Sequence, residues 1–246
     1  MKIIEAKEYQ ELSQLASNYI SGKIKQKPNL TLGLATGGTP KKTYELLIED
    51  HKNNGTSYNS VTTFNLDEYI GLDPENANSY HHYMNQTFFN HIDINRKNIF
   101  IPNGLALKMD QECREYEEKI KSQGGIDLQL LGIGANGHIG FNEPGTPFLS
   151  TTHVIELAPS TREANARFFD SIHDVPTHAI TMGIASIIAS KEILLLVSGE
   201  DKNAALKRLL TDEEPNEDFP ASILKKHPHV TIIADKKALK GVGVMH

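Results

Sequence analysis

Cysteine is almost absent from the chain of 246 residues, which contains a single one, Cys113, and therefore cannot form an internal disulfide bond. Such sparing use of cysteine is typical of proteins in a reducing compartment. Residues 1–17 also lack the apolar core of a secretory signal, because charged residues return after two apolar ones. We therefore expect a cytoplasmic protein.

Positive charge and long apolar runs are scarce as well. The chain has 25 Lys and Arg against 31 Asp and Glu, a net charge of −6, whereas non-specific nucleic-acid binding needs a basic surface. The longest apolar tract, 179–190, is diluted by polar residues and falls well short of the roughly 20 residues that span a bilayer. We expect neither a nucleic-acid partner nor a membrane span.

Short apolar runs rich in β-branched residues alternate with longer amphipathic segments. Near-continuous apolar runs are typical of strands buried on both faces, and apolar residues at helical spacing indicate helices that cover them. The predicted strands are 30–35, 61–66, 98–102, 128–134, 192–199 and 230–235, and the clearest helical segments are 40–53, 79–92, 109–123 and 201–211. Since no repeat or linker divides the chain, we predict one three-layer α/β domain over 1–246 with a mostly parallel sheet.

Four of these strands are followed by unusual loops, at 36–40, 65–69, 132–143 and 198–202. The carboxyl ends of parallel strands meet at one edge of a sheet, where ligands bind in open α/β folds. The four loops are therefore expected to line a single pocket.

The first loop, Thr36-Gly37-Gly38-Thr39-Pro40, places two glycines where a strand turns into a helix. Backbone N–H groups and the helix dipole can then face a phosphate group, although the same pattern also makes a tight turn with proline at the first helical position. The Lys-Ser/Thr ending of a P-loop is absent, which argues against nucleotide hydrolysis.

The third loop begins with the glycine pattern G-x-G-x-x-G at 132–137. A dinucleotide site is disfavoured, because an irregular segment with His138 and Glu143 follows, and no acidic residue ends the next strand. Instead, His138 and Glu143, five residues apart, could aim at one atom as a general acid/base pair, or could be ordinary surface or core groups. None of the histidine pairs has a recognisable set of metal ligands, so no metal site is expected.

Charged residues in the other loops have two interpretations each. Asp67 and Glu68 follow a predicted strand, and their place at the pocket favours Asp67 as a base over a solvated pair of carboxylates. Arg167 and Lys202 could complete a phosphate clamp, or could be ordinary surface charges.

Taken together, these segments resemble the glucosamine-6-phosphate deaminase (isomerase) family. The matching stretches are LATGGTP, FNLDEYIGL, SYHHYM, GIGANGHIGFNEPGT, TREANARFF and SGEDKNAAL, spread from about residue 30 to 210. The resemblance implies a modified Rossmann-like fold and a cofactor-free conversion of glucosamine 6-phosphate and water to fructose 6-phosphate and ammonia.

The resemblance also implies roles for particular residues. Asp67 corresponds to the family's base at C2, and His138, oriented by Glu143 and Asn136, to the group that opens the sugar ring. We expect the Asn136 amide to accept the imidazole N–H, although many relatives have Asp there. The residues that match the phosphate site are Thr36, Gly37, Gly38, Thr39, Arg167 and Lys202, and a mobile lid is implied at about 151–169.

Regulation is expected to be absent. Relatives activated by N-acetylglucosamine 6-phosphate have basic residues after the FNEPG motif and an extended C-terminus that contributes to a hexamer. Here residues 144–160 contain no Lys or Arg, and the chain ends soon after its last predicted strand. We therefore expect a monomer or small homo-oligomer, not an allosteric hexamer.

Two alternatives stay open at this point. A 6-phosphogluconolactonase-like hydrolase would share the fold and the glycine-rich loop followed by Gly-His, but it needs no carboxylate above C2. A non-catalytic sugar-phosphate-sensing domain would usually follow a DNA-binding helix-turn-helix, whereas this sequence starts with a predicted strand and a helix.

Overall fold

The computed structural model describes residues 1–242, so residues 243–246 of the predicted domain lie outside the described part. Its larger sheet has seven strands, all parallel, in the order β1-β10-β9-β6-β2-β3-β5. These strands are β1 (Lys2–Ala6), β2 (Thr31–Leu34), β3 (Thr62–Asn65), β5 (Ile99–Phe100), β6 (Leu128–Leu131), β9 (Glu192–Val197) and β10 (Val230–Asp235). The predicted parallel sheet is confirmed, and each predicted strand lies in it.

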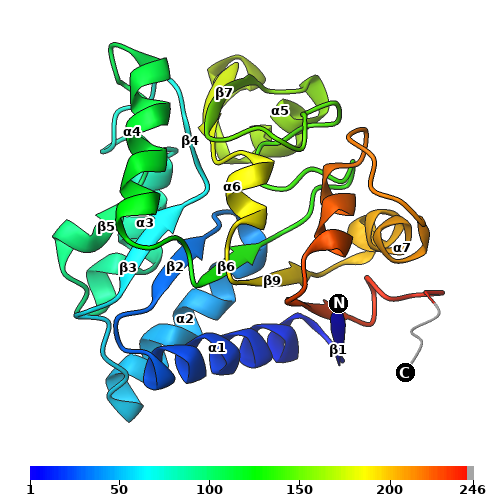
Figure 1. Ribbon diagram of the computed structural model, residues 1–246, viewed down its shortest axis with the longest axis horizontal. Helices are drawn as coiled ribbons and strands as arrows, with labels where there is room; N and C mark the ends of the chain where they lie inside the picture. The colour runs from blue at the N-terminus through cyan, green and yellow to red at the C-terminus, as the bar shows by residue number, and fades with distance from the viewer. Residues whose placement is uncertain (243–246) are drawn as a thin grey trace.

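Helices cover both faces of this sheet, which confirms the three-layer prediction. One face is covered by α1 (Tyr9–Gln26), α2 (Gly38–Asn54) and α3 (Tyr80–Thr87), and the other by α4 (Met109–Ser122), α6 (Ile184–Ile188) and α7 (Asn203–Thr211). Figure 1 shows α1 and α2 below the sheet and α4, α6 and α7 above it.

The helices are held to the sheet by apolar stripes at helical spacing. On α1 the buried residues Leu12, Ala16, Ile20 and Ile24 recur every fourth position and therefore share one face. Of the charged residues of the helix, Lys25 is exposed, and Glu11 and Lys23 are partly exposed. Burial of this kind stabilises the fold by about 1.5–3 kcal/mol for each large aliphatic side chain.

The strand order reverses beside β2, in the middle of the sheet. From β2 the chain proceeds outward to β3 and β5, then crosses to β6 on the other side of β2 and continues outward to β9 and β10. A crevice opens at such a switch point because the connections leave in opposite directions. The loops after β2, β3, β6 and β9 therefore surround one space.

A second sheet was not predicted. Its strands, β4 (Asp67–Tyr69), β8 (His178–Thr181) and β7 (His153–Glu156), are antiparallel in that order. The apolar tract 179–190 is divided between β8 and α6, and α5 (Pro159–Asn165) lies between β7 and β8 in the chain. Unlike the predicted strands, these three are not nearly continuous apolar runs: β4 reads DEY, β7 HVIE and β8 HAIT. Figure 1 shows β7 and α5 together at the top of the view.

Short 3₁₀ helices complete the chain: η1 (Phe89–His91), η2 (Arg96–Asn98), η3 (Ala166–Phe168), η4 (Ile172–Asp174), η5 (Glu200–Lys202) and η6 (Pro220–Lys226). Within residues 1–242, no helix has both the length and the apolar composition needed to cross a membrane.

Candidate active site

A cavity lies at the switch point. Its volume of about 590 Å³ is typical of sites that bind small molecules. The four loops expected to converge all contribute to its lining, and a fifth segment, 160–167 in α5 and η3, contributes as well. Every candidate residue named from the sequence lines this cavity except Glu143, which lies behind His138. The geometry thus joins residues more than 160 positions apart in the chain, from Thr36 to Lys202.

One wall of the cavity is the N-terminus of α2. Gly37 occupies the N-cap position without a side-chain capping bond, and the first turn of the helix contains no acidic residue. The first N–H groups of a helix have no partner within it, and the helix dipole favours negative charge there. Thr36, Gly37, Gly38 and Thr39 therefore form a ready anion site.

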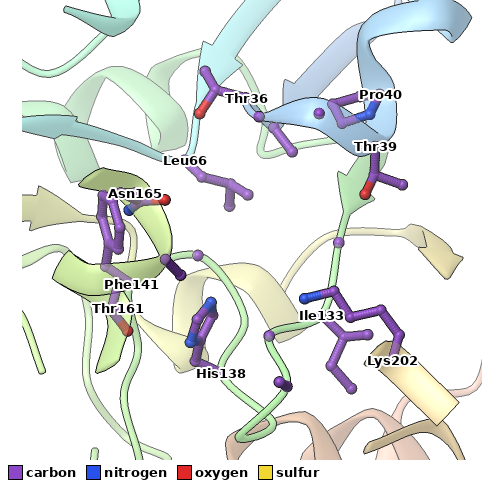
Figure 2. Close-up of a pocket in the computed structure, with 18 of the residues that line it drawn as sticks. Thr36, Thr39, Pro40, Leu66, Ile133, His138, Phe141, Thr161, Asn165 and Lys202 are labelled. Atoms are coloured by element: carbon purple, nitrogen blue, oxygen red, sulfur yellow. The ribbon is translucent and has the colours of Figure 1, made fainter. Parts of the chain in front are cut away.

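Two cations line the same cavity. Lys202, at the end of η5, extends its side chain into the cavity from the side opposite to Thr161 and Asn165, as Figure 2 shows. Its Nζ lies 3.4 Å from the Asp201 carboxylate. Arg167, in η3, also lines the cavity and is exposed, with its guanidinium 4.8 Å from the centre of the Phe168 ring. Together with the helix N-terminus they can bind a dianion.

Asp67, the first residue of β4, is the buried acid of the cavity. The residue is 6% exposed, and its side chain makes no hydrogen bond to any residue in the described range 1–242. Burial, and then the negative charge of Glu68, raise the pKa of Asp67 to about 8. A carboxyl group of this kind can release and recover a proton near neutral pH.

Glu68 points away from the cavity and holds α3. Its carboxylate accepts hydrogen bonds from the backbone N–H groups of Tyr69, Tyr80 and His81, at 2.8–2.9 Å, and Oε2 also lies 2.8 Å from Nδ1 of His81. A carboxylate at a helix N-terminus satisfies otherwise unpaired N–H groups. Of the two adjacent acids, only Asp67 is therefore available for proton transfer in the cavity.

His138 faces the cavity and is backed by Glu143. A Cβ atom at Gly134 would overlap the imidazole ring, so the loop needs glycine there to let His138 pack. The imidazole Nδ1 lies 3.6 Å from Oε2 of Glu143. Burial opposes ionisation of Glu143, but the nearby imidazole of His138, together with hydrogen bonds from Thr161 and Asn136, outweighs it and lowers the pKa of Glu143.

The role expected for the Asn136 amide is wrong in one respect. Its Oδ1 accepts the backbone N–H of His138, at 3.2 Å, and not the imidazole N–H, while its Nδ2 donates to Oε2 of Glu143 at 2.8 Å. The backbone N–H of His138 meets the Asn136 amide across the turn at Gly137, whose φ is 89°. Asn136 therefore braces Glu143 and the loop.

Several residues that line the cavity were not predicted from the sequence. The hydroxyl of Thr161 in α5 donates to Oε1 of Glu143, and Asn165, one helical turn later, lines the same cavity. Thr161 and Asn165 are four residues apart and so share one face of a helix, a spacing from which they could have been predicted as neighbours. Tyr9 and Tyr80 also line the cavity, but nothing near them in the chain connects them with the loops.

No group of three or more His, Cys, Asp or Glu side chains suited to a metal ion occurs in the part of the chain that the structure describes. The polar groups of the cavity are instead an anion site, a buried carboxyl and an imidazole backed by a carboxylate. Such a set can bind a phosphorylated molecule and transfer protons on it.

The fold and the cavity define a Rossmann-like α/β protein in which a buried carboxyl and an imidazole lie in one cavity with an uncapped helix N-terminus. Comparison with protein families is consistent with that class: the model described as "Glucosamine-6-phosphate isomerases/6-phosphogluconolactonase" matches residues 5–233. The chain belongs to this family.

Several similar proteins are named as glucosamine-6-phosphate deaminases or as 6-phosphogluconolactonases. A glucosamine-6-phosphate deaminase of Halalkalibacterium halodurans is 59% identical, over 99% of both chains, and glucosamine-6-phosphate deaminase 1 of Bacillus subtilis is 53% identical, over 97% of this chain and 98% of its own. The solved structure of a monomeric glucosamine-6-phosphate deaminase superimposes with a TM-score of 0.95 at 53% identity, covering 97% and 98% of the two chains. A 6-phosphogluconolactonase from Trypanosoma cruzi shares the fold at 21% identity, with a TM-score of 0.81 over 99% and 97% of the chains.

Proposed function

We propose that this chain is a glucosamine-6-phosphate deaminase, which converts glucosamine 6-phosphate and water to fructose 6-phosphate and ammonia. One observation carries the proposal: the buried carboxyl of Asp67, the imidazole of His138 and an uncapped helix N-terminus line the same cavity. The deaminases of H. halodurans and B. subtilis, which match nearly the whole chain, support the same activity.

The phosphate group of the substrate binds at the N-terminus of α2. Backbone N–H groups of the loop 36–39 hold its oxygens, and Lys202 and Arg167 neutralise its charge from two sides. Binding at a site remote from the reacting carbons fixes the orientation of the sugar over Asp67 and His138.

Ring opening is assigned to His138. The pyranose opens when the proton on O1 is removed and the ring oxygen receives one, a transfer that a single imidazole can carry out in two steps. Glu143 lies 3.6 Å from its Nδ1, and the lowered pKa of Glu143 keeps that carboxylate ionised beside the ring. Its charge stabilises the imidazolium that forms during the transfer.

Isomerisation is assigned to Asp67. Its carboxylate takes the proton from C2, giving an enolamine, and returns it to C1, giving an imine at C2. A base is most effective when its pKa lies near the working pH, and burial brings the pKa of Asp67 to about 8. The positively charged amino group of the substrate favours the ionised form of Asp67 once it is bound.

Hydrolysis of the imine completes the reaction. Water adds to C2, and the C–N bond of the resulting carbinolamine breaks to release ammonia and leave the ketone of fructose 6-phosphate. The atoms balance without an oxidant or a further reactant, because each proton removed from the sugar returns to it or leaves with ammonia.

Three further expectations belong to this proposal. Segment 151–169, whose residues 160–167 line the cavity, acts as a mobile lid over the substrate. The protein works as a monomer or small homo-oligomer, as the monomeric deaminase of similar structure supports. A cytoplasmic location is supported by the single cysteine of the sequence.

Ammonia release from glucosamine 6-phosphate tests the proposal, with Asp67→Asn as the diagnostic variant. Asn cannot accept the C2 proton, so we expect kcat to fall by about 10²–10⁴-fold. The exposed Asp218→Asn is the matched control and keeps the wild-type rate. In heavy water, the wild-type reaction places deuterium at C1 of fructose 6-phosphate.

The alternatives give different outcomes in the same assays. A 6-phosphogluconolactonase hydrolyses the lactone, releases no ammonia and needs no Asp67. A sensing domain binds glucosamine 6-phosphate without turning it over. Either result refutes the deaminase, and an Asp67→Asn variant that releases ammonia as fast as wild type refutes the role assigned to Asp67.

A further inference from the structure

The carbonyl groups of the predicted phosphate loop are held by two tyrosines from outside it. The hydroxyl of Tyr83, in α3, donates to the carbonyl of Gly37 at 2.7 Å. The hydroxyl of Tyr9, at the start of α1, lies 2.9 Å from the carbonyl of Gly38 and 3.1 Å from that of Thr39. Two helices remote in sequence thus contact the backbone of one loop.

Tyr9 also enters the hydrogen-bond ladder of α2. Its hydroxyl accepts the backbone N–H of Lys42 at 3.2 Å while it donates toward the carbonyl of Gly38. Lys42 and Gly38 are the donor and acceptor of an ordinary i to i−4 helical bond. The phenol therefore bridges the first turn of the helix.

These bonds determine where the N–H groups of the loop point. No cis peptide occurs in the described chain, and in a trans peptide the N–H points opposite to the carbonyl of the preceding residue. Tyr83 thereby directs the N–H of Gly38, and Tyr9 that of Thr39, away from the phenols. Gly38 and Thr39 both line the cavity, so an anion bound there meets the backbone N–H groups of these two residues.

We propose that Tyr9 and Tyr83 are positioning residues for phosphate affinity, which fix the two peptides before the ligand binds. Consecutive glycines are otherwise free to adopt many conformations, and ordering them upon binding lowers affinity. The inference rests on the proposed function in so far as the phosphate belongs to the substrate. It assigns no contact with the sugar to either tyrosine.

Removing only the hydroxyl groups tests this inference. In Tyr9→Phe and Tyr83→Phe, we expect the Kd for inorganic phosphate, measured by titration calorimetry, to rise about threefold to tenfold, the range that one hydrogen bond accounts for. The KM for glucosamine 6-phosphate rises by a similar factor. The kcat stays within about twofold of wild type, because Asp67 and His138 are not touched.

Tyr19→Phe is the matched control. Tyr19 also lies on α1, and its hydroxyl also donates a hydrogen bond that Phe cannot make, to Glu192 at 2.9 Å, but it does not line the cavity. It should lose comparable thermal stability with no change in Kd or KM. Tyr9 and Tyr83 lie on different helices. If one of the two variants fails to fold, the phosphate affinity of the other still tests the inference.

The outcomes separate this inference from the proposed function. If both variants bind phosphate as wild type does, or lose kcat at unchanged KM, the positioning role is refuted even though the enzyme is a deaminase. If wild type releases no ammonia but the variants bind inorganic phosphate more weakly, the deaminase proposal fails while the positioning role stands.

Discussion

The side chains of Asp67 and Glu68 lie on opposite faces of β4: Asp67 lines the cavity, whereas Glu68 accepts the backbone N–H groups that begin α3. Successive side chains of a strand alternate between its faces, so adjacency in the chain separates the two carboxyl groups in space. The negative charge of Glu68 nevertheless acts on its neighbour and contributes to the raised pKa of Asp67.

Removing the charge of Glu68 should change the pH dependence of the reaction. In Glu68→Gln the contribution of Glu68 to the raised pKa of Asp67 is lost while burial remains, so Asp67 ionises at lower pH than in wild type. The acidic limb of kcat/KM, which reports the free enzyme, therefore moves to lower pH.

Glu117→Gln is the control for this experiment. Glu117, on α4, accepts hydrogen bonds from Thr152 and Ser186 and does not line the cavity, so its replacement costs similar hydrogen bonds without acting on Asp67. An acidic limb that stays in place, or moves to higher pH, in Glu68→Gln would contradict the electrostatic account.

Asp67→Asn should stabilise the protein while it removes activity. Below pH about 4 the carboxyl is protonated in both the folded and unfolded states; between pH 4 and 8 only the unfolded state loses its proton, so wild-type stability falls as pH rises. The neutral side chain of Asn does not ionise in either state, so the variant does not lose stability in this way. At pH 8 we expect the variant to be more stable by at least about 1 kcal/mol in urea unfolding.

The pH dependence of that difference is the diagnostic. The advantage of Asp67→Asn should be small at pH 4 and grow toward pH 8, whereas the exposed Asp218→Asn should show no such growth. A stability difference that is the same at both pH values would show that burial of the charge is not its cause.

Asn136→Asp is predicted to move the pH profile of ring opening to higher pH. The new carboxylate lies beside Oε2 of Glu143, which now accepts the Asn136 amide at 2.8 Å, and the added negative charge favours the imidazolium form of His138. We expect a shift of about half a unit to one unit, measured with the α-anomer of the substrate.

The same change should lower stability, because it replaces a hydrogen bond with two like charges at contact distance. Asn136→Ala is the comparison: it loses the bond to Glu143 but adds no charge, so its pH profile should stay that of wild type. Coincident profiles for Asn136→Asp and Asn136→Ala would rule out the electrostatic explanation.

Kinetics without cooperativity are expected. Residues 144–160 contain no Lys or Arg that could hold an anionic effector. The rate should depend hyperbolically on glucosamine 6-phosphate, with and without N-acetylglucosamine 6-phosphate, and light scattering should give the mass of a monomer or small homo-oligomer. A sigmoidal curve that becomes hyperbolic with that effector would contradict this.

Much of the architecture follows from local patterns. The apolar runs from Thr31–Leu34 to Val230–Asp235 form the parallel sheet, because a strand buried on both faces leaves a nearly continuous apolar signature. The small sheet left no comparable signal: β4 has three residues, Asp67–Tyr69, which include two acids, and it is a strand only because β8 pairs with it.

The amino-acid sequence by itself determined the alternation of strands and helices, the place of the loops at the strand ends and the residue types able to bind phosphate and move protons. Tertiary structure alone decided that Asp67 is buried, that Asn136 meets Glu143 and the main chain of His138, and that Tyr83 and Tyr9 bind the carbonyls of Gly37 and Gly38. Hydrophobic periodicity is a property of neighbouring residues, whereas the pKa of a carboxyl group and the partner of a hydroxyl depend on atoms that only the folded chain brings together.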